Sequence, residues 1–408
     1  MTLREVIAGA LAVNPVVAAG EGSVRTAWST QRVAYGAYLP TITATSSATR
    51  TGASAGTSSP IPGVGTSSSV ARNATVGLGA AMDLYTGGRR KANDAAARAE
   101  VEAARSTLVA DRYAVTLAAQ RAFYEVIRAA DFVRVAEAAA REAAQLLRYT
   151  TAQSRAGTAT RSDLLRAQLQ VTTTQQQLAA AADTLSADAY ALGWLAGANG
   201  PVAALDDWTA EMTRPLALDD SAIVRLAVDA SPTVAATQAV TLADEAAVRA
   251  ARSLYLPTIS ATAGYSWAAS ATTSSAGTRP GWNIVLGTTY PLFDGFLRED
   301  AVTRAQVAAD VARVTTVDAR RSARAAAAQL LGALRTAVAE IVLGTEAIRS
   351  AREDLRVQMA RYGAGISTML DVLTSQAALV QAEQSLVLAR HRYRITRASL
   401  EALLGRDL

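Results

Sequence analysis

Cysteine is absent from the 408 residues of this chain, and histidine occurs once. Disulfides, thiolate metal sites and thiol nucleophiles are therefore excluded, and we expect no lipid anchor on an N-terminal cysteine. The single histidine, His391, lies in an arginine-rich helical pattern, which favours a surface or packing role over that of a catalytic base. No nucleophile–base pair, metal cluster or phosphate-binding loop stands out, so we expect neither an enzyme nor a cofactor-binding protein.

Aromatic residues and prolines are also scarce, at 5% of the chain and 10 residues, respectively. Half of the residues are apolar, and many of these are alanine, the best helix former. This composition is typical of long helices in coiled-coil contact. The formal net charge is +5, but the basic residues alternate with Asp and Glu. Such mixing indicates solvated helix faces and argues against nucleic-acid binding.

Long apolar runs are missing as well, and no stretch approaches the ~18 consecutive apolar residues expected of a membrane helix. The short run over residues 6–13 imitates a signal peptide. However, its pattern recurs 217 positions later: Val6, Leu11, Asn14 and Pro15 match Ile223, Val228, Ser231 and Pro232. A segment copied in the middle of a chain is structural, so we expect any export signal to have been removed or to lie upstream.

The strongest positive signal is a stretch that occurs twice. Five residues recur with a constant offset of 208 positions: Gly157, Thr160, Asp163, Leu165 and Gln168 match Gly365, Thr368, Asp371, Leu373 and Gln376. An Arg-Tyr pair precedes each copy. In both copies a long helical pattern leads in, glycines interrupt it, and a second helical pattern leads out. The chain is therefore predicted to be two repeats, each folded back on itself at this turn.

We expect the repeats to span residues 1–218 and 219–408. The first repeat is predicted to contain a helix, a strand hairpin over 38–86, a long helix over 89–156 and a return helix over 161–196. The second is predicted to contain a helix, a strand hairpin over 255–294, a long helix over 296–362 and a return helix over 367–404. Serine-, threonine- and glycine-rich loops are expected at 46–72 and 269–280, and a short strand around 203–210.

The predicted strands and helices each need partners. One face of each strand is apolar, with aromatics near the strand ends (Trp267, Trp282 and Tyr290), as in membrane barrels with aromatic girdles. Four strands cannot close a barrel and an open edge cannot sit in lipid, so three chains with twelve strands are the simplest closed solution. The alternative for the strands is a soluble β-domain. For the helices, periodicity does not separate a hollow cylinder from a solid bundle in a filament or tether.

At this point the chain resembles the TolC-type outer-membrane efflux proteins over essentially its whole length. The resemblance rests on an ordered set of motifs: the helix ends at Asn14-Pro15 and Ser231-Pro232, the Tyr-Leu-Pro strand entries at 38–40 and 255–257, the strand exit at 291–295, and the turns from Gly157 to Asp163 and from Gly365 to Asp371. It implies a mainly α fold, in which long antiparallel helical hairpins form an α-barrel tunnel. A 12-stranded β-barrel shared by a homotrimer would continue that tunnel.

The resemblance also implies a location and partners. We expect the bacterial outer membrane, with contact to its lipid and with helices extending into the periplasm. The expected partners are a periplasmic adaptor protein and an inner-membrane transporter, with no nucleic acid. The expected function is a passive exit duct of a tripartite efflux or type I secretion system. The alternative is a non-channel structural coiled-coil or tether protein of the cell envelope.

Two sets of site residues follow from the resemblance. Adaptor docking is expected at the hairpin tips, at Arg155, Ala156, Gly157, Thr158, Ala364, Gly365 and Ile366, for which a plain turn is the alternative. The entrance constriction is expected at Asp371, Thr374, Tyr362, Ser367 and Asp163. Three copies of an acidic residue close together repel one another and attract cations, and Asp371 matches such a position. The alternative for Asp371 is an aspartate that favours a helix N-terminus.

The remaining gate positions distinguish this chain from better-known relatives. The resemblance implies that Asp163 links to Tyr362 and helps to hold the tip closed. Thr374 stands where relatives often carry a second acid, and Ser367 stands where some carry a latch arginine. We therefore expect a gate that is less charged and more weakly held than in those relatives.

Overall fold

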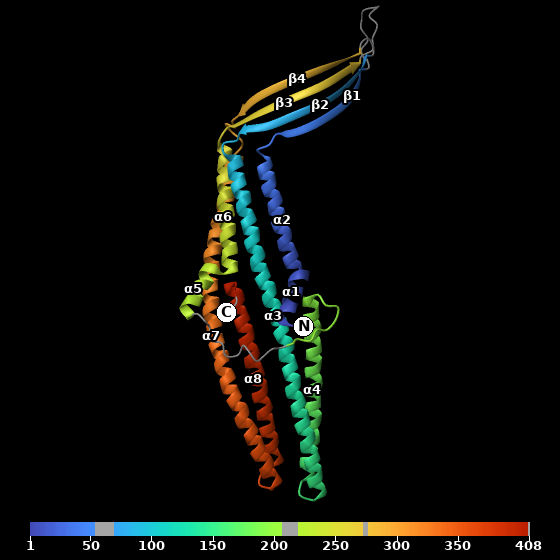
Figure 1. The fold of residues 1–408 in the computed structure, drawn as a ribbon, viewed down its shortest axis with the longest axis vertical. Coiled ribbons are helices and arrows are strands. Elements are labelled where there is room, and N and C mark those ends of the chain that lie inside the picture. Colours follow the sequence, from blue (N-terminus) through green and yellow to red (C-terminus); the bar gives the residue numbers. More distant parts are fainter. Residues whose placement is uncertain (54–68, 206–218, 272–275, 407–408) are drawn as a thin grey trace, which may run out of the picture. The chain divides into compact units, whose positions relative to one another are not determined.

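The computed structural model describes residues 1–53, 69–205, 219–271 and 276–406 (Figure 1). The first half of the chain contains α1 (Leu3–Val13), α2 (Pro15–Gly36), β1 (Thr41–Ala53), β2 (Ser69–Tyr85), α3 (Arg89–Arg155) and α4 (Arg161–Ala196). The second half contains α5 (Asp220–Ala230), α6 (Pro232–Arg252), the 3₁₀ turn η2 (Ser253–Tyr255), β3 (Thr258–Ala271), β4 (Ala276–Thr289), α7 (Leu297–Gly363) and α8 (Met369–Leu404).

Proline sets the boundary between the first two helices. Asn14 ends α1 in an extended conformation, and Pro15 opens α2 at a position where its missing N–H costs nothing. The Asn14 side-chain oxygen accepts a hydrogen bond of 2.8 Å from the Val16 N–H, which caps the new helix. The two helices bend by 52° at this break. Ser231 and Pro232 separate α5 from α6 with the same placement of proline, but the buried Ser231 hydroxyl makes no hydrogen bond among the described residues.

The four strands form one antiparallel sheet in the order β1-β2-β3-β4. The strands are longer than expected, because β1 continues to Ala53 and β2 starts at Ser69, within the loop predicted for 46–72. The loop predicted for 269–280 was likewise too wide, since β3 ends at Ala271 and β4 begins at Ala276. Serine- and threonine-rich runs resemble loops in composition, but threonine is also a good strand former on a half-solvated sheet.

A third predicted feature, the short strand around 203–210, falls mainly outside the described residues. The part that is described, 203–205, contains no strand.

The sheet has one apolar and one polar face. Cross-strand rows on the apolar face join Ala44, Leu78, Tyr265 and Trp282. The face is largely uncovered within the chain, with Ile42 75% and Trp282 76% exposed. The opposite face presents mostly Thr, Ser and Gly, as the period of two along a strand requires.

The chain divides into two compact units that each take residues from both halves of the sequence. The first comprises 1–24, 104–237 and 315–408, and the second comprises 25–103 and 238–314. These units cut across the two predicted repeats, whose boundaries stay a prediction.

Two cores of the first unit use matching positions of the two halves. In one core, Val6 and Ala10 of α1 pack with Phe123 and Leu192. In the other, Ile223 and Ala227 of α5 pack with Leu331 and Leu400. Short helices thus close both hairpins by burying the same stripe of small and branched residues.

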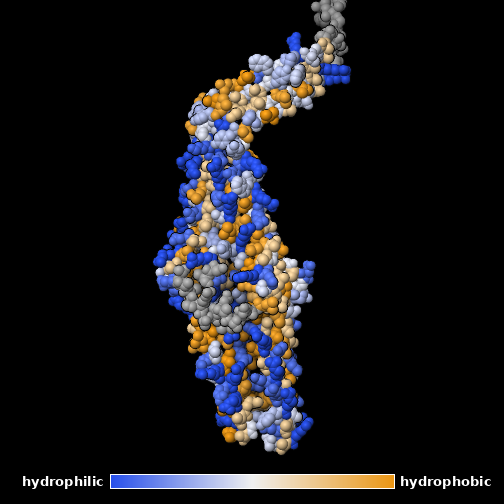
Figure 2. All heavy atoms as spheres, in the orientation of Figure 1, coloured by the Kyte–Doolittle hydropathy of each residue, from blue (hydrophilic) through white to orange (hydrophobic). Residues whose placement is uncertain are grey.

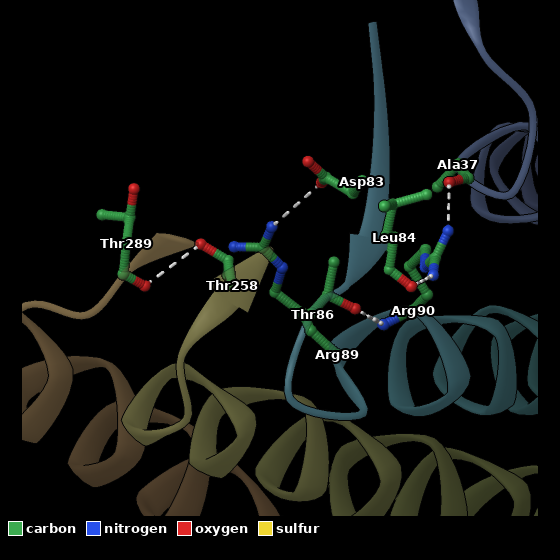
Figure 3. Close-up of polar contacts among 8 residues, drawn as sticks. All are labelled: Ala37, Asp83, Leu84, Thr86, Arg89, Arg90, Thr258 and Thr289. Carbon is green, nitrogen blue, oxygen red and sulfur yellow. Dashed lines mark hydrogen bonds and ion pairs between the residues drawn. The ribbon is translucent and has the colours of Figure 1, made fainter. Parts of the chain in front are cut away.

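Arginines hold the strand-to-helix junctions of the second unit (Figure 3). Arg90, in the first turn of α3, donates hydrogen bonds to the carbonyl oxygens of Leu84 at 2.9 Å and Ala37 at 3.4 Å. Its guanidinium also lies 4.9 Å from the centre of the Tyr38 ring. At the matching position, Arg298 pairs with Asp294 at 2.8 Å and lies 5.1 Å from the Tyr255 ring centre. Arg90 thereby ties α3 to β2, and Arg298 ties the start of α7 to the segment that follows β4 and to the η2 turn that precedes β3.

One expectation about apolar runs is corrected. By length and composition alone, α7 contains an 18-residue window apolar enough to cross a membrane, and α1 with α2 passes the same test as a bent pair. The window contains no long unbroken apolar run, because single polar residues interrupt its Ala, Leu and Val residues.

We predict that Leu192→Ala and Leu400→Ala will each destabilise the protein by about 2–5 kcal/mol, because both side chains are fully buried and leave cavities. The measurement is the shift in the midpoint of thermal unfolding. Leu205→Ala is the control, since this leucine is 66% exposed and its truncation should cost about 0.5 kcal/mol or less. Equal shifts for the three variants would contradict the assignment of the two cores.

Candidate functional site

The repeated turn has the same backbone in both copies. Gly157 and Gly365 adopt positive φ angles of 78° and 72°, a conformation that glycine enters at little cost. After the first glycine, the Thr158 N–H donates to the carbonyl of Gln153 at 2.9 Å. After the second, the Ile366 N–H donates to the carbonyl of Arg361 at 2.8 Å. Both long helices therefore end in a Schellman-type cap that reverses the chain.

The threonine and aspartate of each turn then start the return helix. The Asp163 carboxylate accepts from the Thr160 N–H at 3.1 Å and hydroxyl at 2.7 Å, and the Thr160 hydroxyl oxygen accepts from the Asp163 N–H. The Asp371 carboxylate accepts from the Thr368 N–H and hydroxyl, both at 2.8 Å. These are reciprocal capping boxes. They account for the repeated Gly-x2-Thr-x2-Asp pattern by local structure alone.

Capping also sets the charge of Asp371. The hydrogen bond from the Thr368 N–H, followed by that from its hydroxyl, holds the pKa of the Asp371 carboxyl below its usual range. The positive charge of Arg361 acts in the same direction. Asp371 is therefore an exposed carboxylate that stays ionised at neutral pH. Asp371 therefore caps the start of α8, as the alternative interpretation expected. This capping is compatible with an additional role in a ring of carboxylates.

Apolar side chains pack the two hairpins against each other just behind the turns. Every one of the four long helices contributes to this tip core, which consists of Leu146, Ala167, Leu355, Tyr362, Met369, Val372 and Leu379. Leu146 and Val372 are fully buried. The two turns are consequently the ends of one packed element, and movement of one hairpin must disturb this core.

Tyr362 enters the tip core with its ring. The centres of the Tyr362 and Tyr149 rings lie 6.3 Å apart, so the tyrosines of the two repeated Arg-Tyr pairs meet each other. Burial, and then the Asp163 carboxylate, raise the pKa of Tyr362. Its buried hydroxyl makes no hydrogen bond of good geometry among the described residues, although the nearby Thr150 side chain lowers its pKa. The link to Asp163 expected from the resemblance is thus not formed within this chain, where Asp163 is bonded to Thr160.

The other predicted gate residues lie on the same helix starts. Thr374, one turn after Asp371, is exposed on the same face of α8, and its hydroxyl donates to the Leu370 carbonyl at 2.9 Å. The Ser367 hydroxyl donates to the carbonyl of Gln358 at 3.2 Å, which ties the turn back to α7. Asp371 and Thr374 are therefore free to face a second molecule, whereas Ser367 serves the turn.

The residues predicted for adaptor docking are all exposed at the tips: Arg155, Ala156, Gly157, Thr158, Ala364, Gly365 and Ile366. Ile366 is 68% exposed, an unusual state for a large apolar side chain at a turn. Trp267, Trp282 and Tyr290 belong to the other compact unit. They are at least half exposed, with Trp267 and Trp282 on the apolar face of the sheet.

Sequence reasoning missed the tight contact between Tyr149 and Gly363. A Cβ atom on Gly363 would lie 2.7 Å from the Tyr149 hydroxyl oxygen, so a larger residue there would have to displace the Tyr149 side chain. Gln153 donates a hydrogen bond of 3.1 Å to the same hydroxyl. The repeated Arg-Tyr pair was the available signal. It could indicate that the tyrosines are equivalent, but not that they touch.

Comparisons with known proteins agree with this geometry. The model of the Outer membrane efflux protein family matches residues 6–198 and 223–406. Protein CyaE of Bordetella pertussis is 26% identical over 413 residues, which cover 99% of this chain and 84% of CyaE.

Solved structures share the fold at low sequence identity. CusC has a TM-score of 0.86 at 21% identity, with coverage of 99% of this chain and 92% of CusC. VceC of Vibrio cholerae has a TM-score of 0.82 at 20% identity, with coverage of 99% and 96%. The open state of the MtrE channel of Neisseria gonorrhoeae has a TM-score of 0.81 at 20% identity, with coverage of 100% and 89%.

These matches confirm the predicted fold class of long helical hairpins with a four-stranded contribution to a barrel. The family match takes in both helical hairpins, both strand pairs and both repeated turns. The chain belongs to the outer membrane efflux protein family.

Proposed function

We propose that this protein is the outer-membrane exit duct of a tripartite efflux or type I secretion system, and that it works as a homotrimer. Substrate passes through it passively, and the chain acts as a conduit and not as a catalyst. One observation carries the proposal: a four-stranded sheet whose apolar face is exposed and whose edge strands, β1 and β4, have a neighbour on one side only.

Such a sheet is unsuited to water and, by itself, to lipid. Its exposed apolar face favours a hydrocarbon environment. The free backbone groups of β1 and β4 would each cost several kcal/mol in lipid unless they pair. Three copies, with β4 of one beside β1 of the next, give twelve strands and no edge. The polar face, rich in Thr, Ser and Gly, would then line a water-filled lumen.

The helical part supports self-association as well. Val307, Val311 and Val314 of α7 are exposed at helical spacing, and so are Val338 and Val342. The helices of a second copy would cover these stripes and extend the barrel as a hollow helical cylinder. The tether alternative accounts for long helices, but it gives no reason for an exposed apolar sheet.

The tips are the proposed gate and docking end. Asp371 and Thr374 share an exposed face of α8, where threefold symmetry would gather three carboxylates around the axis. The exposed turns, Ile366 included, would receive a periplasmic adaptor protein coupled to an inner-membrane transporter. Membership of the efflux family supports these partners.

The duct itself is tested by single-channel recording of the purified protein in planar lipid bilayers. We expect discrete, uniform conductance steps and a trimeric mass in detergent. A tether would give neither, so a monomeric or dimeric protein without conductance steps would overturn the proposal.

The carboxylate ring is tested with Asp371→Asn, which removes the charge but keeps an oxygen for the Thr368 cap. We expect block by divalent cations to weaken by about tenfold, or about 1.4 kcal/mol. Asp163→Asn is the matched control, because it makes the same change in the equivalent capping box. Similar cation block in the parent and Asp371→Asn proteins would show that Asp371 only caps its helix.

Closure of the tip is tested at Tyr362. Its ring packs in the tip core, so we expect the ring, and not the hydroxyl, to stabilise the closed tip. Tyr362→Ala removes the ring from the tip core, which should cost about 3–5 kcal/mol and raise the conductance of the closed state. Tyr362→Phe should change the conductance little, because the hydroxyl makes no hydrogen bond among the described residues. If Phe opens the channel as much as Ala, a hydrogen bond formed in the assembly must hold the gate.

A further inference from the structure

The sheet carries positive charge only, apart from Asp83 at the end of β2 that leads into α3. In residues 41–82 and 258–289, which include all four strands except the end of β2, the only charged residues are Arg50, Arg72 and Arg279. Neither segment contains Asp or Glu, and each segment includes the hairpin connection between its two strands. Elsewhere in the chain many arginines form an ion pair with an acidic side chain. Arg89, for example, pairs with Asp83. Any negatively charged partner of these three arginines must therefore lie outside the two segments.

Two of these arginines lie directly opposite each other. Arg50 of β1 is the register partner of Arg72 of β2, and both are exposed. Side chains at such positions have Cβ atoms about 4.5–5.5 Å apart, and like charges there are destabilising. Neither arginine has an ion-pair partner among the residues that the structure describes. An anion between them would turn this repulsion into a binding site.

The pair lies on the apolar face of the sheet. Arg50 follows Ile42 and Ala44 at even spacing along β1, and Arg72 precedes Val76 and Leu78 at even spacing along β2. Side chains two apart on a strand share a face. The guanidinium groups therefore stand on the side that we propose to contact lipid, next to a hollow lined by Ala48, Ala74, Ala271 and Ala276. Figure 2 shows strongly hydrophilic residues at this end of the sheet, whose remaining visible surface mixes apolar and weakly polar residues.

Their depth can be estimated from the aromatic residues. Trp267 is level with Val76, which pairs with Ser46, and Arg50 lies four residues further along β1. This spacing is about 13 Å along the strand. For strands tilted by about 45°, it corresponds to a height of about 10 Å. If Trp267 marks the edge of the hydrocarbon layer, the arginine pair is at the level of the lipid headgroups.

We propose that Arg50 and Arg72 together bind the phosphate group of a membrane-lipid headgroup. The lipid belongs to the leaflet at the hairpin-loop end of the sheet, because the opposite strand ends lead into the long helices. Two guanidinium forks match the oxygens of one phosphate, and an exposed phosphomonoester suits them best. A second copy of the chain could not replace the lipid, since its segments 41–82 and 258–289 are equally free of acids and its one strand acid, Asp83, lies at the opposite end of β2. This inference rests on the proposed insertion of the sheet in a membrane.

Arg279 provides the matched control. It pairs with Ala268, one position away from the row that joins Trp267 and Pro280, and so it lies on the polar face at the same end of the sheet. Removing Arg279 changes the net charge of the protein by the same amount, but on the side proposed to face the lumen.

The test measures phosphatidic acid binding to the full-length protein by native mass spectrometry in a neutral detergent. Arg50→Gln and Arg72→Gln should each lower the affinity about fivefold, and the double variant about twenty-five-fold, whereas Arg279→Gln should leave it unchanged. An equal loss for Arg279→Gln would overturn the proposal in favour of non-specific attraction. If the double variant does not fold, the two single variants decide, and unchanged affinity in both would overturn it.

Two further arms separate the possible explanations. Inorganic phosphate should fail to displace the bound lipid, and displacement at equal concentration would show a site for free anions instead. Conductance in phosphatidylcholine bilayers, recorded for each protein, tests the duct independently. Conducting variants with unchanged lipid affinity would refute only the lipid site, whereas a parent protein without conductance would refute the proposed function.

Discussion

The constraint behind this architecture is that backbone N–H and C=O groups must be paired wherever water is absent. A single chain presents four strands and leaves the outer sides of β1 and β4 without a strand partner. Long helices pair all of their internal backbone groups without help, so in the proposed trimer it is the sheet that would require a second and a third copy. The sheet, the smaller part of the chain, would therefore set the requirement for assembly. The helices would contribute contacts through their exposed valine stripes.

In the proposed duct, the residues of the turn at the hairpin tips would serve both folding and gating. Gly365, Thr368 and Asp371 are all needed to end one helix and begin the next. The Asp371 carboxylate is held by two donors and kept ionised by them, which is also what a cation-attracting ring requires. Because the same pattern is present at Asp163, the repeat is explained by capping, and any difference in gating must come from what surrounds the two caps.

The periodicity of the sequence predicted most of the fold, since the ends of the long helices are marked by glycine, proline and Thr-x2-Asp signals. The strand ends were harder to predict, because the serine- and threonine-rich run before Ala53 looks like a loop until it is paired with its neighbour. At the site, the glycine-containing turns predicted that their residues would be exposed, and they are. The contact of Tyr149 with Tyr362 could not be predicted in this way, because it depends on how two distant hairpins pack. That the Tyr362 hydroxyl forms no bond with Asp163 among the described residues likewise depends on how the side chains of the two hairpins pack.

The distribution of charge follows from the same constraint that demands assembly. A charged side chain on the lipid face costs about 2–4 kcal/mol at the bilayer midplane and about 0–1 kcal/mol near the interface. The apolar face of the sheet accordingly carries no acid, and it carries charge only at one end, at Arg50 and Arg72. In the helices, by contrast, water solvates both signs and ion pairs such as Arg392 with Glu340 are common. An arginine pair retained where charge is otherwise excluded is best explained by an anion that belongs to the membrane itself.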